Sequence, residues 1–391
     1  MTESAKAPPI LSRFKYEIRI VLLSLLLIVV YLTIAYLVHE PRGYYGTIDQ
    51  PRFADPWIAR SETLLNGGLL YKDTFTATPP LTNFLLVLPS LVPIYFGNVN
   101  PWSTLSYMLF FSLFNIFTAF VVFRMIPDRS TGFKAAVLFL LNPLTFGNTI
   151  LRRQDESIVV FFIALSILFM FQERHTVASI AIGVSTLIKL SGAFIIPIAL
   201  LHFRDWRYLV IPALVFILVM APFLLLAGSD AIFFNPGTDR GQHPFQFKGV
   251  SLPALWNQMN GDSGQITLLP VSAAMVLATC ITLLIIAWKR FGLLEDMILL
   301  TTAIYVFSPK LHTGYFSLLI MLMAPLIRNK VTAVVYMAFG AIAVIADFYK
   351  WPIANFQMAF WLMVLALVLL IGLAIYLVMQ TQAESKQIEV A

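Results

Sequence analysis

The sequence predicts an all-α protein that crosses a membrane many times. The chain has 391 residues, 59% of them hydrophobic, and its mean hydropathy is +0.83. Soluble domains do not reach this composition. Apolar runs of about 18 residues or more recur along the chain, as in spanning helices, whereas a membrane barrel would show short alternating segments. We therefore expect one integral-membrane domain over residues 1–391.

Twelve spans are predicted from the apolar runs. The first run is not a cleavable signal peptide, because no small-residue cleavage site ends it. The net charge of +6 is spread along the chain and indicates topology, not a nucleic-acid partner. The single cysteine, Cys280, excludes an intramolecular disulfide. The predicted spans are 18–38, 103–124, 134–150, 157–172, 177–188, 191–203, 208–228, 267–288, 295–308, 315–327, 331–349 and 357–379.

Residues 80–96 decide the topology. This segment is apolar, but four prolines interrupt or precede it. If it crossed the membrane, Arg124, Arg129 and Lys134 would lie outside; if it stays at the outer surface, basic residues collect inside, as the positive-inside rule requires. We therefore predict an interfacial or re-entrant helix at 80–96, with both termini cytoplasmic.

Residues 177–203 are predicted to form a helical hairpin. This segment is too long for one simple membrane crossing and short for two. Lys189, Ser191 and Gly192 mark the expected turn. A lysine in such apolar surroundings is costly unless it has a partner or reaches water. Lys189 is thus either a functional cation or a side chain that snorkels to the outer interface.

The predicted topology places most acidic residues on the extracytoplasmic side. The first extracytoplasmic loop spans residues 39–102, and a long loop with His243 spans residues 228–266. An amphipathic helix is expected over 53–65, with Trp57 in the bilayer interface and a stop at the following Asn-Gly-Gly. Such a one-sided distribution suits an enzyme better than a transporter. The acids of the first loop are Glu40, Asp49, Asp55, Glu62 and Asp73.

Asp49 and Asp55 are the predicted catalytic residues. A carboxylate at the membrane surface can act as a general base toward an attacking hydroxyl. Glycosyl transfer also passes through a cation-like transition state that negative charge favours. The alternative is that both aspartates are simply solvated.

The loop motif resembles the first luminal loop of the GT-C glycosyltransferases. The similarity covers Asp49-x-x-x-Phe53-x-Asp55, then Asn-Gly-Gly-x-x-Tyr71, then Phe75-x-x-x-Pro-Pro-Leu. It is closest to polyprenyl-phosphomannose-dependent mannosyltransferases, including the catalytic subunit of GPI mannosyltransferase I and bacterial α-1,2-mannosyltransferases. The resemblance implies that Asp49 is catalytic. Thr47 replaces the first acid of the Asp-x-Asp found in GPI-type members, so no metal is expected.

The other outer segments supply candidate ligands for phosphate. Arginine suits a phosphate group, although each arginine here has the alternative of snorkelling at a helix end. The resemblance assigns the lipid phosphate to Lys189. His312 is either a hydrogen-bond donor to the leaving group or a structural cap. The predicted phosphate or donor ligands are Arg152, Arg153, Lys189, Lys310 and His312, and the predicted acceptor or secondary residues are Asp155, Glu156, Tyr71 and Tyr315.

The sequence therefore predicts an inverting glycosyltransferase without a cofactor. No nucleotide-binding or zinc-binding pattern is present. The expected donor is a polyprenyl or dolichyl phosphate hexose, with mannose favoured, and the expected acceptor is a glycolipid or lipid-linked glycan; transfer to protein or lipid A is a related alternative. The membrane would be the plasma membrane in a prokaryote or the endoplasmic reticulum in a eukaryote. A lipid-linked sugar flippase and a non-catalytic subunit are the rivals.

Overall fold

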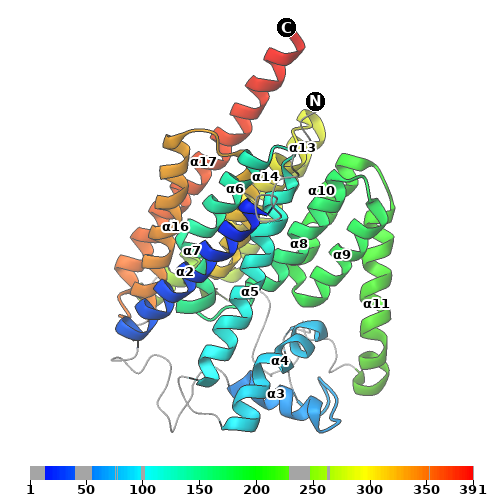
Figure 1. Cartoon of the computed structure of the whole chain (residues 1–391), viewed down its shortest axis with the longest axis vertical. Coiled ribbons are helices and arrows are strands. Elements are labelled where there is room, and N and C mark those ends of the chain that lie inside the picture. The colour runs from blue at the N-terminus through cyan, green and yellow to red at the C-terminus, as the bar shows by residue number, and fades with distance from the viewer. Residues whose placement is uncertain are drawn as a thin grey trace, which may run out of the picture.

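The computed structural model describes residues 14–39, 55–74, 76, 78–97, 102–228, 247–261, 265–351 and 353–390. Helices form almost all of this part of the chain (Figure 1). The elements are α2 (Lys15–His39), α3 (Asp55–Leu65), α4 (Pro80–Phe96), α5 (Trp102–Met125), α6 (Arg129–Leu141), α7 (Pro143–Phe146), η2 (Gly147–Leu151), α8 (Glu156–Phe171), α9 (His175–Ile188), η3 (Leu190–Ile195), α10 (Ile196–Phe203), α11 (Arg207–Ala227), β1 (Lys248–Gly249), α12 (Leu252–Asn260), α13 (Leu268–Lys289), α14 (Leu293–Phe307), β2 (Lys310–Leu311), η5 (Thr313–Tyr315), α15 (Phe316–Met323), η6 (Ala324–Leu326), α16 (Lys330–Lys350) and α17 (Phe356–Val390).

The predicted all-α, polytopic membrane fold is confirmed. Each of the twelve predicted spans coincides with a helix or a broken helix. Within the described ranges, six helices are long and apolar enough to cross a bilayer, and α6 with α7–η2 makes a seventh bent span. The remaining spans coincide with shorter helices, α8, α9, η3–α10, α14 and η5–α15–η6.

A proline breaks the third predicted span. Asn142 precedes Pro143 and is extended, because a residue before proline avoids the helical region. Its side chain accepts a hydrogen bond from the Leu144 backbone N–H at 3.0 Å and donates one to the Tyr336 carbonyl at 2.9 Å. The helix axis bends by 55° at this break. This bend carries the chain to residues 152–156, which lie in the site described below.

The predicted hairpin at residues 177–203 is present. α9 ends at Ile188, Lys189 is extended, and η3 starts the second arm, which runs back alongside α9. Gly192 is needed at this turn, since a Cβ there would lie 2.4 Å from the Ser185 carbonyl carbon. The close approach keeps the two arms of the hairpin together.

The loop that was predicted to be the first extracytoplasmic one contains two helices at one end of the molecule (Figure 1). α3 ends one residue before Asn66-Gly67, as predicted, and Gly67 has a φ of 78°. Trp57 packs against the rings of Tyr107 and Phe111, with centroids 5.0 and 5.7 Å away, so α3 is held against α5. α4 packs on α3 and α5.

The described parts of the predicted outer loops meet at this same end, which we call the cavity end. Lys248 and Gly249 of β1 pair in parallel with Lys310 and Leu311 of β2. Gly249 has a φ of 73° and lies too close to the Leu311 carbonyl for a side chain. The pairing holds the segment before α12 against the segment before η5.

Basic residues cluster at the other ends of these helices, which we call the opposite end. The side chain of Arg129 pairs with Glu17 at 2.7 Å, and Arg207 pairs with Asp205 at 2.6 Å. Arg204 follows α10, and Arg290 follows α13. Acidic residues such as Glu17 and Asp205 also occur at this end, but basic residues outnumber them, which agrees with the topology predicted from charge.

Candidate active site

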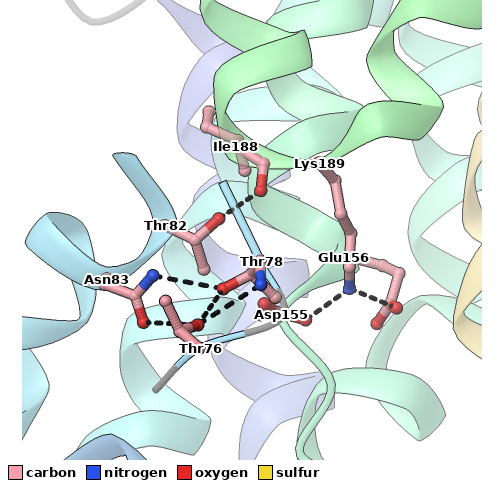
Figure 2. Close-up of polar contacts among 8 residues, drawn as sticks. All are labelled: Thr76, Thr78, Thr82, Asn83, Asp155, Glu156, Ile188 and Lys189. Atoms are coloured by element: carbon pink, nitrogen blue, oxygen red, sulfur yellow. Dashed lines mark hydrogen bonds and ion pairs between the residues drawn. The ribbon is translucent and has the colours of Figure 1, made fainter. Parts of the chain in front are cut away.

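A buried lysine bound by two carboxylates forms the centre of the site. Lys189 caps α9, and its Nζ lies 2.6 Å from Asp155 Oδ1 and 2.5 Å from Glu156 Oε1, at the start of α8 (Figure 2). Leaving any of these charges unpaired inside the protein would be costly. Lys189 is therefore a fixed cation and does not snorkel into the lipid interface.

A network of short polar side chains joins the first loop to α9. Thr82 donates a hydrogen bond to the carbonyl of Ile188, the residue before Lys189 (Figure 2). The hydroxyls of Thr76 and Thr78 are 2.8 Å apart, and the Asn83 amide donates to Thr78 at 3.1 Å. These contacts place the turn before α4 beside the lysine.

A cavity of about 640 Å³ opens from this cluster and runs between η3–α10, α13 and α14. Its polar end has Lys189, Ser191, Lys310 and Tyr315 as lining residues. Its remaining wall is largely apolar, with Phe194, Pro197, Met275, Val276, Thr279, Cys280, Leu300 and Ile304. Cationic groups at one end and a long apolar wall match a lipid with an anionic headgroup.

Lys310 and Tyr315 line the polar end of the cavity, and His312 lies behind Tyr315 without lining the cavity. The Lys189 ammonium is 6.0 Å from the centre of the Tyr315 ring, which meets the His312 ring edge-on at 5.6 Å. Burial lowers the pKa of His312 well below 6.5, and Lys310, Lys189, Lys248 and Arg152 lower it further. The pKa of Lys310 is also lowered, first by burial and then by Lys248 and Lys189. Lys310 and His312 therefore lie close to several cations, while Asp155 and Glu156 offset the charge of Lys189.

The two predicted arginines lie beside the cavity without lining it. Arg152 forms an ion pair with buried Asp347, and its guanidinium is 5.3 Å from the Trp351 ring centre. Arg153 is buried and donates a hydrogen bond to Thr104 at 3.2 Å. Arg152 contributes positive potential toward His312, but neither arginine reaches the cavity wall.

Tyr71 is buried next to the site and has a strained backbone. Its φ of 72° is unusual for a residue other than glycine. Its hydroxyl donates to the Thr78 carbonyl at 2.8 Å, and its ring meets Phe223 edge-on. Tyr71 therefore helps to position Thr78, which lines the cavity.

The structure does not describe the side chains of the two predicted catalytic carboxylates. Asp49 and His243 lie outside the described residues, and of Asp55 the structure describes only that its backbone begins α3. Among the residues that are described, no three His, Cys, Asp or Glu side chains come together as a metal site.

Three further cations near the cavity were missed by the sequence analysis. Arg60 of α3 has a pKa that burial lowers and that Asp155 and Tyr71 raise, which places its charge close to theirs. Lys248 pairs with Lys310 through β1 and β2. Lys350 is buried at the end of α16 and donates to the Gly249 carbonyl. Of these three cations, only Lys350 could have been found from the sequence, because it is a charged residue at the end of an apolar run.

The fold and the cavity define an integral-membrane protein with a largely apolar cavity that has two lysines at one end. Residues 75–309, more than half of the chain, match the family model of glycosyltransferase family 87. The chain belongs to this family and is a membrane glycosyltransferase. A comparison with curated proteins finds no match.

Proposed function

We propose that the chain is an inverting glycosyltransferase that takes a hexose from a polyprenyl or dolichyl monophosphate carrier. The proposed sugar is mannose, and the proposed acceptor is a glycolipid or a lipid-linked glycan. The observation that supports this most directly is the cavity between η3–α10, α13 and α14, whose polar end has two lysines and whose remaining wall is largely apolar.

The two lysines are suited to the phosphate of the carrier. Lys189 is preorganised by Asp155 and Glu156, so it needs no rearrangement to meet an anion. Burial lowers the pKa values of Lys310 and His312 most, and neighbouring positive charges lower them further; a phosphate would relieve this second effect. Ser191 and Tyr315 add hydroxyl groups at the same end. In this proposal Asp155 and Glu156 position Lys189.

The apolar part of the cavity is suited to the prenyl chain. α13 packs mainly on α14, and Ile286 is the one residue along it that is fully buried. Val276 and Cys280 of this helix line the cavity and are also exposed. A carrier in the membrane can therefore reach the cavity from the lipid side, with its phosphate at the lysines.

The proposed chemistry is a single displacement. The acceptor oxygen attacks the anomeric carbon as the bond from that carbon to the phosphate oxygen breaks. Asp49 accepts the hydroxyl proton, Asp55 assists it, and the lysines stabilise the phosphate that leaves on its lipid. Inversion turns a β-linked donor into an α-linked product. Because fixed cations match the leaving group, the proposal includes no divalent metal.

The proposed site faces the extracytoplasmic side. The opposite end has basic helix termini such as Arg174, Arg207 and Lys330, which the positive-inside rule places in the cytoplasm. The membrane is then the plasma membrane of a prokaryote or the endoplasmic reticulum of a eukaryote.

The test is sugar transfer by the purified protein in nanodiscs. Radiolabelled polyprenyl-phosphate mannose and a lipid extract of the host are supplied with EDTA. Wild type is compared with Asp49→Asn, Asp49→Ala and the control Glu62→Gln, an exposed acid on α3. We expect transfer that survives EDTA and falls by about 10²–10⁴ in both Asp49 variants, the usual contribution of a general base.

Two other outcomes would change the proposal. Transfer that is unaffected by Asp49 substitution would remove the proposed base but keep the donor. No transfer from any polyprenyl-phosphate sugar would favour a flippase or a non-catalytic subunit.

A further inference from the structure

A second pocket lies at the opposite end, far from the proposed active site. It has a volume of about 440 Å³ and lies where α10 and α13 end and α14 begins. The six residues of η3 and residues 196–199 of α10 separate its first lining residue, Leu200, from Lys189. At the usual rises of a 3₁₀-helix and an α-helix, this path is about 18 Å long. Residues of α10, α13 and α14 line both cavities, but no residue lines both.

Two arginines at helix ends line this pocket. Arg204 follows α10 and Arg290 follows α13, and both have left-handed backbones, with φ of 52° and 50°. Both are exposed, and no ion pair to either occurs within the described residues. Their guanidinium groups are therefore available to an anion.

A buried carboxylate lines the same pocket. Asp296, in the first turn of α14, is 2% exposed, and its Oδ2 lies 3.7 Å from His202 Nδ1. The carboxylate of Glu295 and the backbone N–H of Phe291, which donates a hydrogen bond to it, also lie close to Asp296. Its Oδ1 has no hydrogen-bond partner in the part of the chain that the structure describes. A buried carboxylate oxygen that lacks a hydrogen-bond donor is energetically costly. The pocket is therefore suited to a ligand that has a hydrogen-bond donor as well as an anionic group.

Aromatic residues place the pocket at the depth of lipid headgroups. Trp206 and Trp288 flank it in sequence and are 69% and 76% exposed. The Lys289 ammonium lies 4.0 Å from the Trp288 ring centre. Exposed tryptophans beside basic residues are typical of the boundary between hydrocarbon and headgroups. Phosphate groups and amines of lipids are concentrated at this depth.

We infer that this pocket binds the headgroup of a phospholipid that has both a phosphate and a primary ammonium. The phosphate lies between Arg204 and Arg290, and the ammonium donates to Asp296 Oδ1. A quaternary ammonium has no N–H group and leaves that oxygen without a donor. The pocket therefore discriminates between phosphatidylethanolamine and phosphatidylcholine.

Native mass spectrometry of the purified full chain in detergent tests the inference directly. Phosphatidylethanolamine, phosphatidylcholine and phosphatidylglycerol with identical acyl chains are titrated separately. We expect one phosphatidylethanolamine to bind about tenfold more tightly than phosphatidylcholine, as one charge-assisted hydrogen bond allows. The double variant Arg204→Gln, Arg290→Gln should lose this tight site. Asp296→Asn should keep phosphate binding and lose the preference for the primary amine.

The matched control is Arg328→Gln with Lys330→Gln. These residues are also exposed, precede or begin α16 at the same end, and line no part of the pocket. The inference is overturned if wild type binds the three lipids equally, or if the control weakens binding as much as the arginine pair. If Asp296→Asn fails to fold, the double arginine variant and the comparison of the three lipids on wild type still test the inference. Because lipid binding is measured rather than transfer, the result does not depend on the proposed reaction.

Discussion

The two cavities between η3–α10, α13 and α14 hold their positive charges in different ways. At the cavity end, Lys189 is buried and bound by two carboxylates. At the opposite end, Arg204 and Arg290 are exposed and line a pocket whose one carboxylate is buried. A buried, paired cation is already oriented to bind an anion. Its removal leaves its carboxylate partners buried without a counter-charge. An exposed cation is hydrated when the pocket is empty, so its loss affects binding far more than folding.

The largest effect is expected for Lys189→Met. The substitution leaves Asp155 and Glu156 buried without their cation, and removing one partner of a buried ion pair costs about 3–5 kcal/mol. We expect a large fall in the free energy of unfolding and loss of transfer. Thermal unfolding in detergent measures the first, with Arg204→Gln as the exposed-cation control, which should change stability by less than about 0.5 kcal/mol.

A triple variant separates folding from function at this lysine. Lys189→Met with Asp155→Asn and Glu156→Gln removes the charges together, so much of the lost stability should return. Transfer should stay absent, because the phosphate still lacks its cation. A triple variant that recovers both stability and transfer would show that Lys189 is only structural.

A smaller effect is expected for Lys310→Gln. Lys310 lines the cavity, and no salt bridge to it occurs among the described residues, so its loss should leave stability nearly unchanged. A hydrogen bond to a charged group contributes about 1.5–3 kcal/mol, which corresponds to a rise in donor KM of roughly tenfold or more. Steady-state kinetics with a titrated donor measure this. A change in kcat alone would contradict donor binding at Lys310.

His312 gives a pH-dependent effect of intermediate size. Its pKa in the folded protein is well below the ordinary 6.5, so below that pH the unfolded chain binds a proton that the folded protein does not. Stability should therefore be fully present above about pH 6.5 and fall as the pH decreases, by at most about 1.4 kcal/mol per pH unit. Melting temperatures from about pH 8 to about pH 5 should fall less steeply for His312→Gln. Parallel curves would contradict the buried neutral histidine.

The difference between the two cavities also explains what the sequence could predict. Hydropathy located the helices, because each predicted span depends only on local composition. The positive-inside rule predicted the end at which basic residues outnumber acidic ones, although lysines and arginines also gather at the cavity end. The pairing of Lys189 with Asp155 and Glu156 was out of reach, since it joins residues more than thirty positions apart without a shared periodicity.

Other parts of the site also depend on tertiary contacts. Arg152 suited a phosphate by residue type, but its pairing with Asp347 follows from the packing of α16 beside α7 and η5. Lys248 reaches the site only because Gly249 allows β1 to approach β2. The lipid pocket was missed because Arg204 and Arg290 looked like topology signals alone, and the buried position of Asp296 cannot be read from its neighbours in sequence.

The smallest expected effect is on the labelling of Cys280. This is the only cysteine of the chain; it is exposed and lines the apolar part of the cavity, so a maleimide modifies one site. A bound prenyl chain should cover the thiol and slow labelling several-fold. The matched control is Leu277→Cys with Cys280→Ser, which places the thiol on an exposed part of α13 outside the cavity. Polyprenyl phosphate should protect only the native cysteine, and phosphatidylethanolamine should protect neither, because its pocket lies at the other end of the helix. Equal protection of both thiols would mean that the carrier coats α13 without entering the cavity.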